Sequence, residues 1–171
     1  MAFTQVELAE LDVNPFDKIG SEWMLVTAGS GVEDCNTMTA SWGGLGVNWG
    51  RNVATIYLRP QRYTKEFLER EGRFTLSFFG VGNEREALGL LGRVSGRDVP
   101  DKIAQAGLVP VDLAGSVTFE QAALVLVCRT LYADAIDPAR FLDETIDAAC
   151  YPEHDYHTLY IAEIEAAYVN E

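Results

Sequence analysis

Hydroxyl side chains recur at every second position in residues 36–41. Successive side chains of an extended strand point to opposite faces. One face therefore carries Thr37, Thr39 and Ser41, and the other carries Met38, Ala40 and Trp42. Hydroxyls can hydrogen-bond the carbonyl and imide edges of a flat polar heterocycle, and the glycines at positions 43, 44 and 46 would let backbone approach it closely. A half-exposed strand before a glycine-rich turn explains the same pattern, and it is favoured while the stretch is taken alone.

Two arginines stand close to a predicted helix start. Arg59 ends a predicted strand, Arg62 comes three residues later, and Thr64 would cap the helix. Arginine offers planar pairs of donors that match a phosphate. The free N–H groups at the start of a helix also favour an anion. The alternative is a pair of surface arginines bound to Glu66 or Glu69, and the sequence leaves both interpretations open.

A third segment, Ser95-Gly96-Arg97-Asp98, offers a hydroxyl, a flexible backbone and a cation. It could close over a cofactor or bind the phosphate of a pyridine nucleotide. An ordinary connection between two helices needs no function, and the sequence slightly favours that interpretation.

His157 is the better ligand-contacting candidate of the two histidines in the chain. It could stack against a ligand or donate a hydrogen bond to it, although a lone histidine is more often structural. The cluster Glu153-His154-Asp155-Tyr156-His157 has neither HExxH spacing nor a cysteine partner, so no metal site is expected there.

The distribution of charge indicates an anionic ligand of small size. The net charge of −13 argues against nucleic-acid binding, which needs a cationic face. Residues 51–102 nevertheless hold ten of the thirteen Lys and Arg against seven acids, a local excess of positive charge. Such a region would attract a small anion while the whole protein repels polyanions. Solvated charges on outer helix faces are the alternative.

Length and composition set further bounds. The chain of 171 residues is expected to form one domain over residues 1–171. It holds no apolar run of the roughly 20 residues that a spanning helix needs, and the acidic N-terminus lacks the basic start of a secretory signal. Three widely spaced cysteines favour reduced thiols in a cytoplasmic protein.

Periodicity and turn residues divide the chain into short strands and a few helices. Strands are expected over residues 23–28, 37–41, 53–58, 74–79, 124–132 and 157–164, with the last residues of the final strand fraying or turning helical. Helices are expected over residues 64–70, 84–91 and 101–106, the first ended by Gly72. Short strands without regular βα alternation predict a mainly β fold, an antiparallel barrel with helices outside. A doubly wound parallel fold is the less favoured alternative.

Five motifs occur in an order that is typical of a known family. They are Asn36–Ser41, Arg59–Thr64, Phe74–Phe79, Ser95–Asp98 and His157–Ile161. From about Trp23 to Ile164 the chain resembles the flavin reductase-like family and, within it, the flavoredoxin-type branch. The resemblance implies a split barrel that binds flavin mononucleotide (FMN): an antiparallel Greek-key barrel with flanking helices, as a homodimer with flavin near the subunit interface. FMN combines the two ligand chemistries above, a flat polar heterocycle and a phosphate.

The resemblance also implies roles for individual residues. The isoalloxazine ring and upper ribityl chain would be lined by Thr37, Met38, Thr39, Ala40, Ser41 and Trp42. The phosphate would be surrounded by Arg59, Arg62, Tyr63 and Thr64, with Ser95, Gly96 and Arg97 nearby on the flavin or the nicotinamide side. His157 matches the family histidine near the reactive face of the flavin. Small residues often follow the Thr-Ala-Ser run in related reductases, whereas here Trp42 follows and could narrow or cover the site.

By this resemblance the protein is expected to be an NAD(P)H-dependent flavin reductase, in which hydride passes from NADH or NADPH to flavin N5. The alternative is a flavoredoxin-like electron carrier whose tightly bound FMN is reduced by a redox partner protein. A third hypothesis is an FMN-binding protein without turnover of its own. The sequence does not separate them, because a nicotinamide can stack on flavin without a motif of its own.

Overall fold

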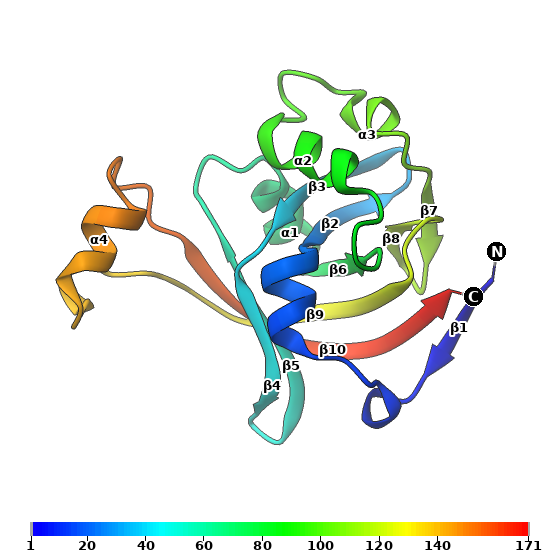
Figure 1. Ribbon diagram of the computed structural model, residues 1–171, viewed down its shortest axis with the longest axis horizontal. Helices are drawn as coiled ribbons and strands as arrows, with labels where there is room; N and C mark the ends of the chain where they lie inside the picture. The colour runs from blue at the N-terminus through cyan, green and yellow to red at the C-terminus, as the bar shows by residue number, and fades with distance from the viewer. Residues whose placement is uncertain (1, 171) are drawn as a thin grey trace.

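Figure 1 shows the computed structural model of the chain, which describes residues 2–170. Its frame is an eight-stranded sheet in which each strand runs antiparallel to its neighbours. In neighbour order the strands are β3 (Asp34–Ala40), β2 (Met24–Gly31), β6 (Arg73–Phe78), β9 (Leu124–Ala135), β10 (Thr158–Asn170), β5 (Arg51–Leu58) and β4 (Gly43–Asn48), and β1 (Phe3–Val6) pairs with the end of β10. The mainly β, antiparallel prediction is confirmed.

A separate hairpin and several helices cover the sheet. The hairpin of β7 (Pro110–Leu113) and β8 (Ser116–Phe119) is joined to β6 by buried hydrogen bonds, from Thr75 Oγ1 to Val117 O and between the hydroxyls of Ser77 and Thr118. The helices are α1 (Thr64–Glu71), α2 (Arg85–Arg93), α3 (Lys102–Gln105) and α4 (Glu144–Cys150), with the 3₁₀ turns η1 (Leu8–Glu10) and η3 (Pro138–Arg140) and the π-helix η2 (Phe16–Glu22). No helix in residues 2–170 is long and apolar enough to cross a membrane.

Residues 136–157, which connect β9 to β10, form an arm that carries α4 away from the barrel (Figure 1). The backbone N–H of Ile136 donates to His157 O and closes the base of the arm. Because β5 pairs with the start of β10, His157 lies beside the end of β5, where Arg59 follows. The last residue of the arm, His157, therefore lies at the end of the barrel where β3 and β5 also end.

Alternate residues of β2 serve two apolar cores, as the two-residue period of a strand requires. Met24 and Val26 pack inside the barrel with Phe74 and Leu76, whereas Leu25 packs outward against Leu88 and Leu91 of α2. α2 packs on β3 as well, where Thr39 Oγ1 donates to Leu88 O and Gly92 lies against the Thr39 side chain.

The predicted strands correspond to β2, β3, β5, β6, β9 and β10, and the predicted helices to α1, α2 and α3. Gly72 ends α1 in the left-handed region, with φ of 65° and its N–H donating to Leu68 O, as predicted. The expected fraying or helical turn at the end of the final strand is wrong, because β10 continues as a strand to Asn170 and pairs with β9 and β1.

Two local predictions fail for reasons visible in the packing. Thr64 is not the N-cap of α1: Tyr63 holds that position without a side-chain cap, and the Thr64 hydroxyl instead accepts from Asn36 Nδ2 at 2.8 Å. The glycines after Trp42 form β4 rather than a turn. A Cβ on Gly43 would lie 2.6 Å from Thr55 O, so close pairing with β5 requires glycine there.

Candidate functional site

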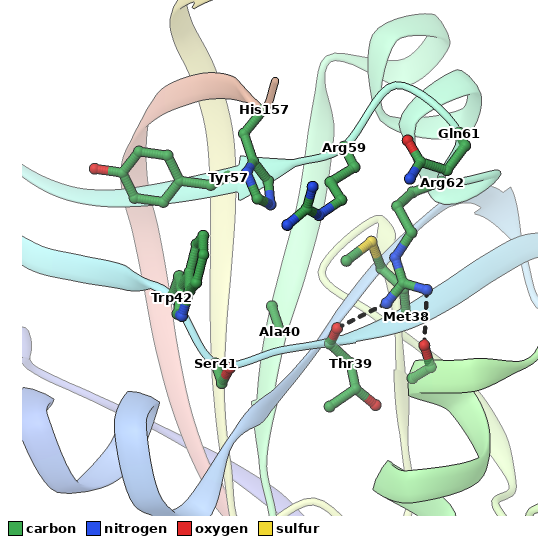
Figure 2. Close-up of a pocket in the computed structure, with 11 residues that line it drawn as sticks. Met38, Thr39, Ala40, Ser41, Trp42, Tyr57, Arg59, Gln61, Arg62 and His157 are labelled. Carbon is green, nitrogen blue, oxygen red and sulfur yellow. Dashed lines mark hydrogen bonds between the residues drawn. The ribbon is translucent and has the colours of Figure 1, made fainter. Parts of the chain in front are cut away.

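A cavity of about 380 Å³ opens at the barrel end where β3, β5 and β10 meet. Figure 2 shows its walls: the end of β3 and the following Trp42 on one side, Arg59 and Arg62 on another, and His157 beside Tyr57. Its lining residues are Met38, Thr39, Ala40, Ser41, Trp42, Tyr57, Arg59, Gln61, Arg62, Gly92 and His157. We call this the larger cavity, in contrast to the smaller cavity described next; an apolar cavity described further below exceeds both in volume.

A second cavity of about 170 Å³ adjoins it, and the two share Met38, Gln61 and Arg62. The lining residues of this smaller cavity are Asn36, Met38, Gln61, Arg62, Tyr63, Thr64, Arg93, Val94, Ser95 and Lys102. It gathers three cations, Arg62, Arg93 and Lys102, and within residues 2–170 none of them forms an ion pair with a carboxylate. This cavity has the donor set of an anion site.

Arg62 stands at the junction of the two cavities. Its guanidinium donates to Gly92 O at 2.8 Å and to Thr39 O at 3.2 Å, which ties α2 and β3 together (Figure 2). Burial lowers the pKa of Arg62, and the nearby Arg59 lowers it further. Carbonyl oxygens hold the guanidinium in place without cancelling its charge, so the charge remains for a ligand.

Lys102 is held in the same way. It is only 2% exposed, and its Nζ donates to Thr37 O at 2.7 Å and to Val94 O at 3.0 Å. Burial lowers the pKa of Lys102 to about 8, and the charge of Arg62 contributes in the same direction. A buried lysine between carbonyls and another cation would be stabilised by an anion beside it.

The predicted Ser95-Gly96-Arg97 segment is divided by the fold. Ser95 lines the smaller cavity, and Gly96 packs so closely on Asn36 that a Cβ would lie 2.3 Å from its Oδ1. Arg97 turns outward, where it forms an ion pair with Glu66 and stacks over the Tyr63 ring at 4.7 Å from the centroid. The segment thus supplies one hydroxyl to the smaller cavity and fixes Tyr63 at its edge.

Arg59 belongs to the larger cavity and is neutralised there by the arm. It pairs with Asp155 at 2.5 Å and donates to Cys150 O at 2.9 Å, and Gln61 donates to the other oxygen of Asp155 at 2.7 Å. The alternative in which Arg59 and Arg62 pair with Glu66 or Glu69 is therefore wrong. Those glutamates pair with other residues, Glu66 with Arg97 and Glu69 with Lys65.

The row of hydroxyls on β3 is mostly engaged inside the protein. Thr37 is fully buried and shares a 2.8 Å hydrogen bond with Thr27, and Thr39 donates to Leu88 O at 2.6 Å. Ser41 lies at the wall of the larger cavity, alongside the side chains of Met38 and Ala40. The strand thus offers the cavity one hydroxyl, apolar side chains and its backbone.

Aromatic rings close the far wall of the larger cavity. Trp42 lies 5.2 Å from the His157 ring, centroid to centroid, and Tyr57 meets the same imidazole edge-on at 6.4 Å. Burial lowers the pKa of His157 to about 4, with the charge of Arg59 acting in the same direction, so His157 is neutral at physiological pH. Trp42 remains 46% exposed, as a ring over an open site would be.

An apolar cavity of about 710 Å³ lies on the other side of Trp42 and shares Ser41, Trp42 and Tyr57 with the larger cavity. Its remaining lining residues come from η2 and the proline before it, from β4 and from the arm: Pro15, Phe16, Ile19, Gly20, Gly43, Gly44, Leu45, Ile136, Phe141, Ile146 and Tyr151. A flat apolar molecule could reach the larger cavity from this side.

Sequence reasoning missed Lys102, Arg93, Gln61, Tyr57 and Gly92. The excess of positive charge in residues 51–102 was the one signal that included Arg93 and Lys102. Gln61 lies inside the Arg59–Thr64 motif but was given no role, and no local pattern marks Tyr57 or Gly92. In the part of the chain that the structure describes, no cluster of three or more His, Cys, Asp or Glu could hold a metal ion, and the three cysteines are free thiols.

Comparison with known proteins agrees with this architecture. The model of the flavin reductase like domain matches residues 16–171. Among solved structures, the FMN-binding domain of a flavin reductases-like enzyme from Shewanella baltica OS155 is 18% identical, with a TM-score of 0.68 over 98% of this chain and 77% of that one. No curated protein sequence matches the chain.

Two further solved structures share the fold. Flavoredoxin of Desulfovibrio vulgaris (Miyazaki F) is 20% identical, with a TM-score of 0.66 over 98% of this chain and 78% of that one. The styrene monooxygenase flavin reductase from Pseudomonas putida S12 is 19% identical, with a TM-score of 0.62 over 88% and 80%. The fold and site define a flavin reductase-like split barrel. The chain belongs to the flavin reductase-like family.

Proposed function

We propose that the chain binds FMN across the two adjoining cavities and works as an NAD(P)H-dependent flavin reductase. The observation that carries the proposal is the junction at Arg62. There a cavity walled by aromatic rings meets one lined by three cations that form no ion pair with any carboxylate of residues 2–170. An aromatic heterocycle joined to a phosphate has both properties in one molecule.

The residues present fit FMN by the chemistry of their donors. Arg62, Arg93 and Lys102 would hold the phosphate, together with the hydroxyls of Thr64 and Ser95. Thr64 already accepts a hydrogen bond from Asn36, so its own proton is left to donate. The isoalloxazine ring would lie in the larger cavity between β3 and the rings of Trp42 and His157.

FMN, when bound, supplies the redox chemistry by accepting hydride at N5 and passing electrons on. The chain needs no strong acid or base for this, and it offers none in the larger cavity: Arg59 is paired with Asp155, and His157 is neutral. Its residues bind and orient the ring and limit water. The apolar cavity beyond Trp42 is where we propose that the nicotinamide of NADH or NADPH approaches.

The second candidate function is electron transfer by permanently bound FMN that a redox partner protein reduces. Trp42 favours it, since an indole ring at the mouth of the larger cavity would slow the exchange of flavin. A homodimer and a cytoplasmic location stay predictions. Phe16, which lines the apolar cavity, and Leu142 on the arm are exposed, and we propose that a second subunit would cover them.

Steady-state oxidation of NADH and NADPH, with FMN added, tests the reductase proposal. Protein-dependent turnover with either nucleotide supports the proposal. The absence of turnover with NADH and also with NADPH rejects it. Anaerobic stopped-flow mixing separates the second candidate. Fast reduction of bound FMN by a partner reductase, without reduction by either nucleotide, would identify an electron carrier.

A further inference from the structure

A buried hydrogen bond connects the arm to the larger cavity. Tyr151, on the arm, is 4% exposed, and His157 at the cavity wall is 7% exposed. The Tyr151 hydroxyl oxygen lies 2.8 Å from His157 Nδ1, and the two rings meet edge-on with centroids 5.5 Å apart. Water has little access to either partner, so each depends on the other for this bond.

The chemistry of the pair favours the phenol as the donor. A neutral imidazole carries one N–H and one lone pair, and its unprotonated nitrogen accepts a hydrogen bond better than a phenol oxygen does. When the Tyr151 hydroxyl donates to Nδ1, the imidazole proton resides on Nε2. Figure 2 shows the His157 imidazole beside Tyr57, Trp42 and Arg59 at the wall of the larger cavity.

The charged surroundings keep the imidazole neutral. Arg59 stacks over the Tyr151 ring at 5.1 Å from its centroid and is paired with Asp155, and Arg62 stands across the cavity. Burial and, next, the charge of Arg59 lower the pKa of His157; Asp155 acts in the opposite direction, and Arg62 adds a smaller lowering than either charge. The neutral form that the tautomer requires is therefore the form present at pH 7.

We propose that Tyr151 is a positioning residue that holds His157 in the Nε2–H tautomer and so gives the larger cavity a fixed hydrogen-bond donor. The arm then has a role in the site although it lies outside the barrel. The identity of the molecule that receives the bond rests on the proposed function, in which it is FMN. The tautomer itself is a property of this chain.

The experiment is NMR spectroscopy of the full-length protein labelled with ¹⁵N at histidine, recorded first without FMN. The chain has only two histidines, and a His154→Gln variant assigns the remaining signals to His157. We expect a pyridine-type Nδ1 and a pyrrole-type Nε2 at pH 7, unchanged down to about pH 5 because the pKa of His157 lies near 4. A proton on Nδ1, or an imidazolium at pH 7, overturns the proposal.

A matched pair of variants isolates the hydroxyl. Tyr151→Phe removes the donor, and we expect the His157 nitrogen signals to shift toward a mixture of tautomers. Tyr156→Phe removes a neighbouring phenol that bonds His154 and Asp147 instead, so it should move only the His154 signals. If the His157 signals are the same in Tyr151→Phe as in the wild type, the positioning role is rejected. If Tyr151→Phe does not fold, the wild-type Nδ1 signal decides: an upfield shift from a free pyridine-type nitrogen marks the hydrogen bond from the Tyr151 hydroxyl, and an unshifted signal rejects the positioning role.

FMN is then added to the same sample. A shift of the His157 Nε2–H signal on saturation is expected, with the Nδ1 signal remaining pyridine-type. A protein that shows the Nε2–H tautomer but binds no FMN refutes the proposed function and leaves the role of Tyr151 intact. A protein that binds FMN while Nε2 is unprotonated refutes the positioning role alone.

Discussion

The smaller and the larger cavity meet at Arg62 but differ in charge: the cations of the smaller cavity keep their charge, whereas Arg59 and His157 in the larger cavity are neutralised or uncharged. In the smaller cavity, Arg62 and Lys102 are held by backbone carbonyls, which orient a cation without neutralising it. In the larger cavity, Arg59 is neutralised by Asp155, and His157 is buried in its uncharged form. The difference separates two tasks: uncompensated positive charge retains an anion, whereas a neutral aromatic wall suits a flat ring whose charge changes.

The largest expected effect concerns the neutral wall. Because the pKa of His157 falls from 6.5 to about 4 on folding, its contribution to stability is fully present above pH 6.5 and is lost as pH falls toward 4. The shift corresponds to about 3 kcal/mol. The free energy of unfolding of the wild type, measured in urea, should therefore drop by about that much more than that of His157→Gln between pH 7 and pH 4.

The exposed His154 provides the control for this measurement. His154→Gln should keep the difference from His157→Gln, because His154 is exposed and does not line the larger cavity. Parallel curves for the wild type and His157→Gln would show that His157 is not held neutral, and the contrast between the cavities would be lost.

The next largest effect tests the cationic side. Arg62→Ala removes the bridge between Thr39 O and Gly92 O and, in the proposed complex, a donor to the phosphate. We expect FMN binding to weaken by about 1–3 kcal/mol, measured by quenching of flavin fluorescence. Lys65→Ala is the matched control, because Lys65 lies nearby in sequence but pairs with Glu69 outside the cavity. Equal affinities of both variants would make Arg62 a purely structural residue.

Much of the sheet and its helices could be predicted from the sequence. The surroundings of Arg62 show which contacts could not. Alternating or continuous apolar runs identified β5, β6 and β9, and the arginine pair pointed to an anion. The carbonyls that hold Arg62 were invisible, since Gly92 lies 30 residues along the chain and meets Arg62 only when α2 packs on β3.

Partners at long range were equally hidden. Asp155 neutralises Arg59 from 96 residues away, and nothing near either residue marks the pair. Lys102 lies on a four-residue helix, and only the tertiary fold turns its side chain toward Thr37 O. Sequence patterns report local geometry and local charge, whereas these contacts depend on which elements become neighbours.

A smaller effect should appear in the pH dependence of FMN affinity. The pKa of Lys102 in the free protein is about 8, and a phosphate beside it favours the protonated form. Binding should therefore weaken as pH rises through 8, by about ten-fold between pH 7 and pH 9. The Lys102→Met variant should bind FMN more weakly than the wild type at pH 7, and its affinity should not change between pH 7 and pH 9. A flat wild-type profile would place the phosphate away from Lys102.

The smallest expected effect concerns the mouth of the larger cavity. Trp42→Ala removes the ring that lies 5.2 Å from His157 and should speed the release of FMN about three- to ten-fold. Trp49→Ala, at the exposed turn between β4 and β5, should leave the release rate unchanged. Both rates can be followed by trapping released flavin with an excess of a second FMN-binding protein. If Trp42→Ala releases FMN at the wild-type rate, the second candidate function, a carrier with permanently bound FMN, loses its main support.

The central claim is that the two cavities together hold one FMN, and the flavin content of gel-filtered protein tests it most directly. Purified protein is saturated with FMN, freed of excess ligand by gel filtration, and its flavin absorbance is compared with its protein concentration. The account predicts about one FMN per chain, and inorganic phosphate at high concentration should compete with it, because the smaller cavity takes the phosphate group. Protein that emerges colourless, with no flavin absorbance, would contradict the account.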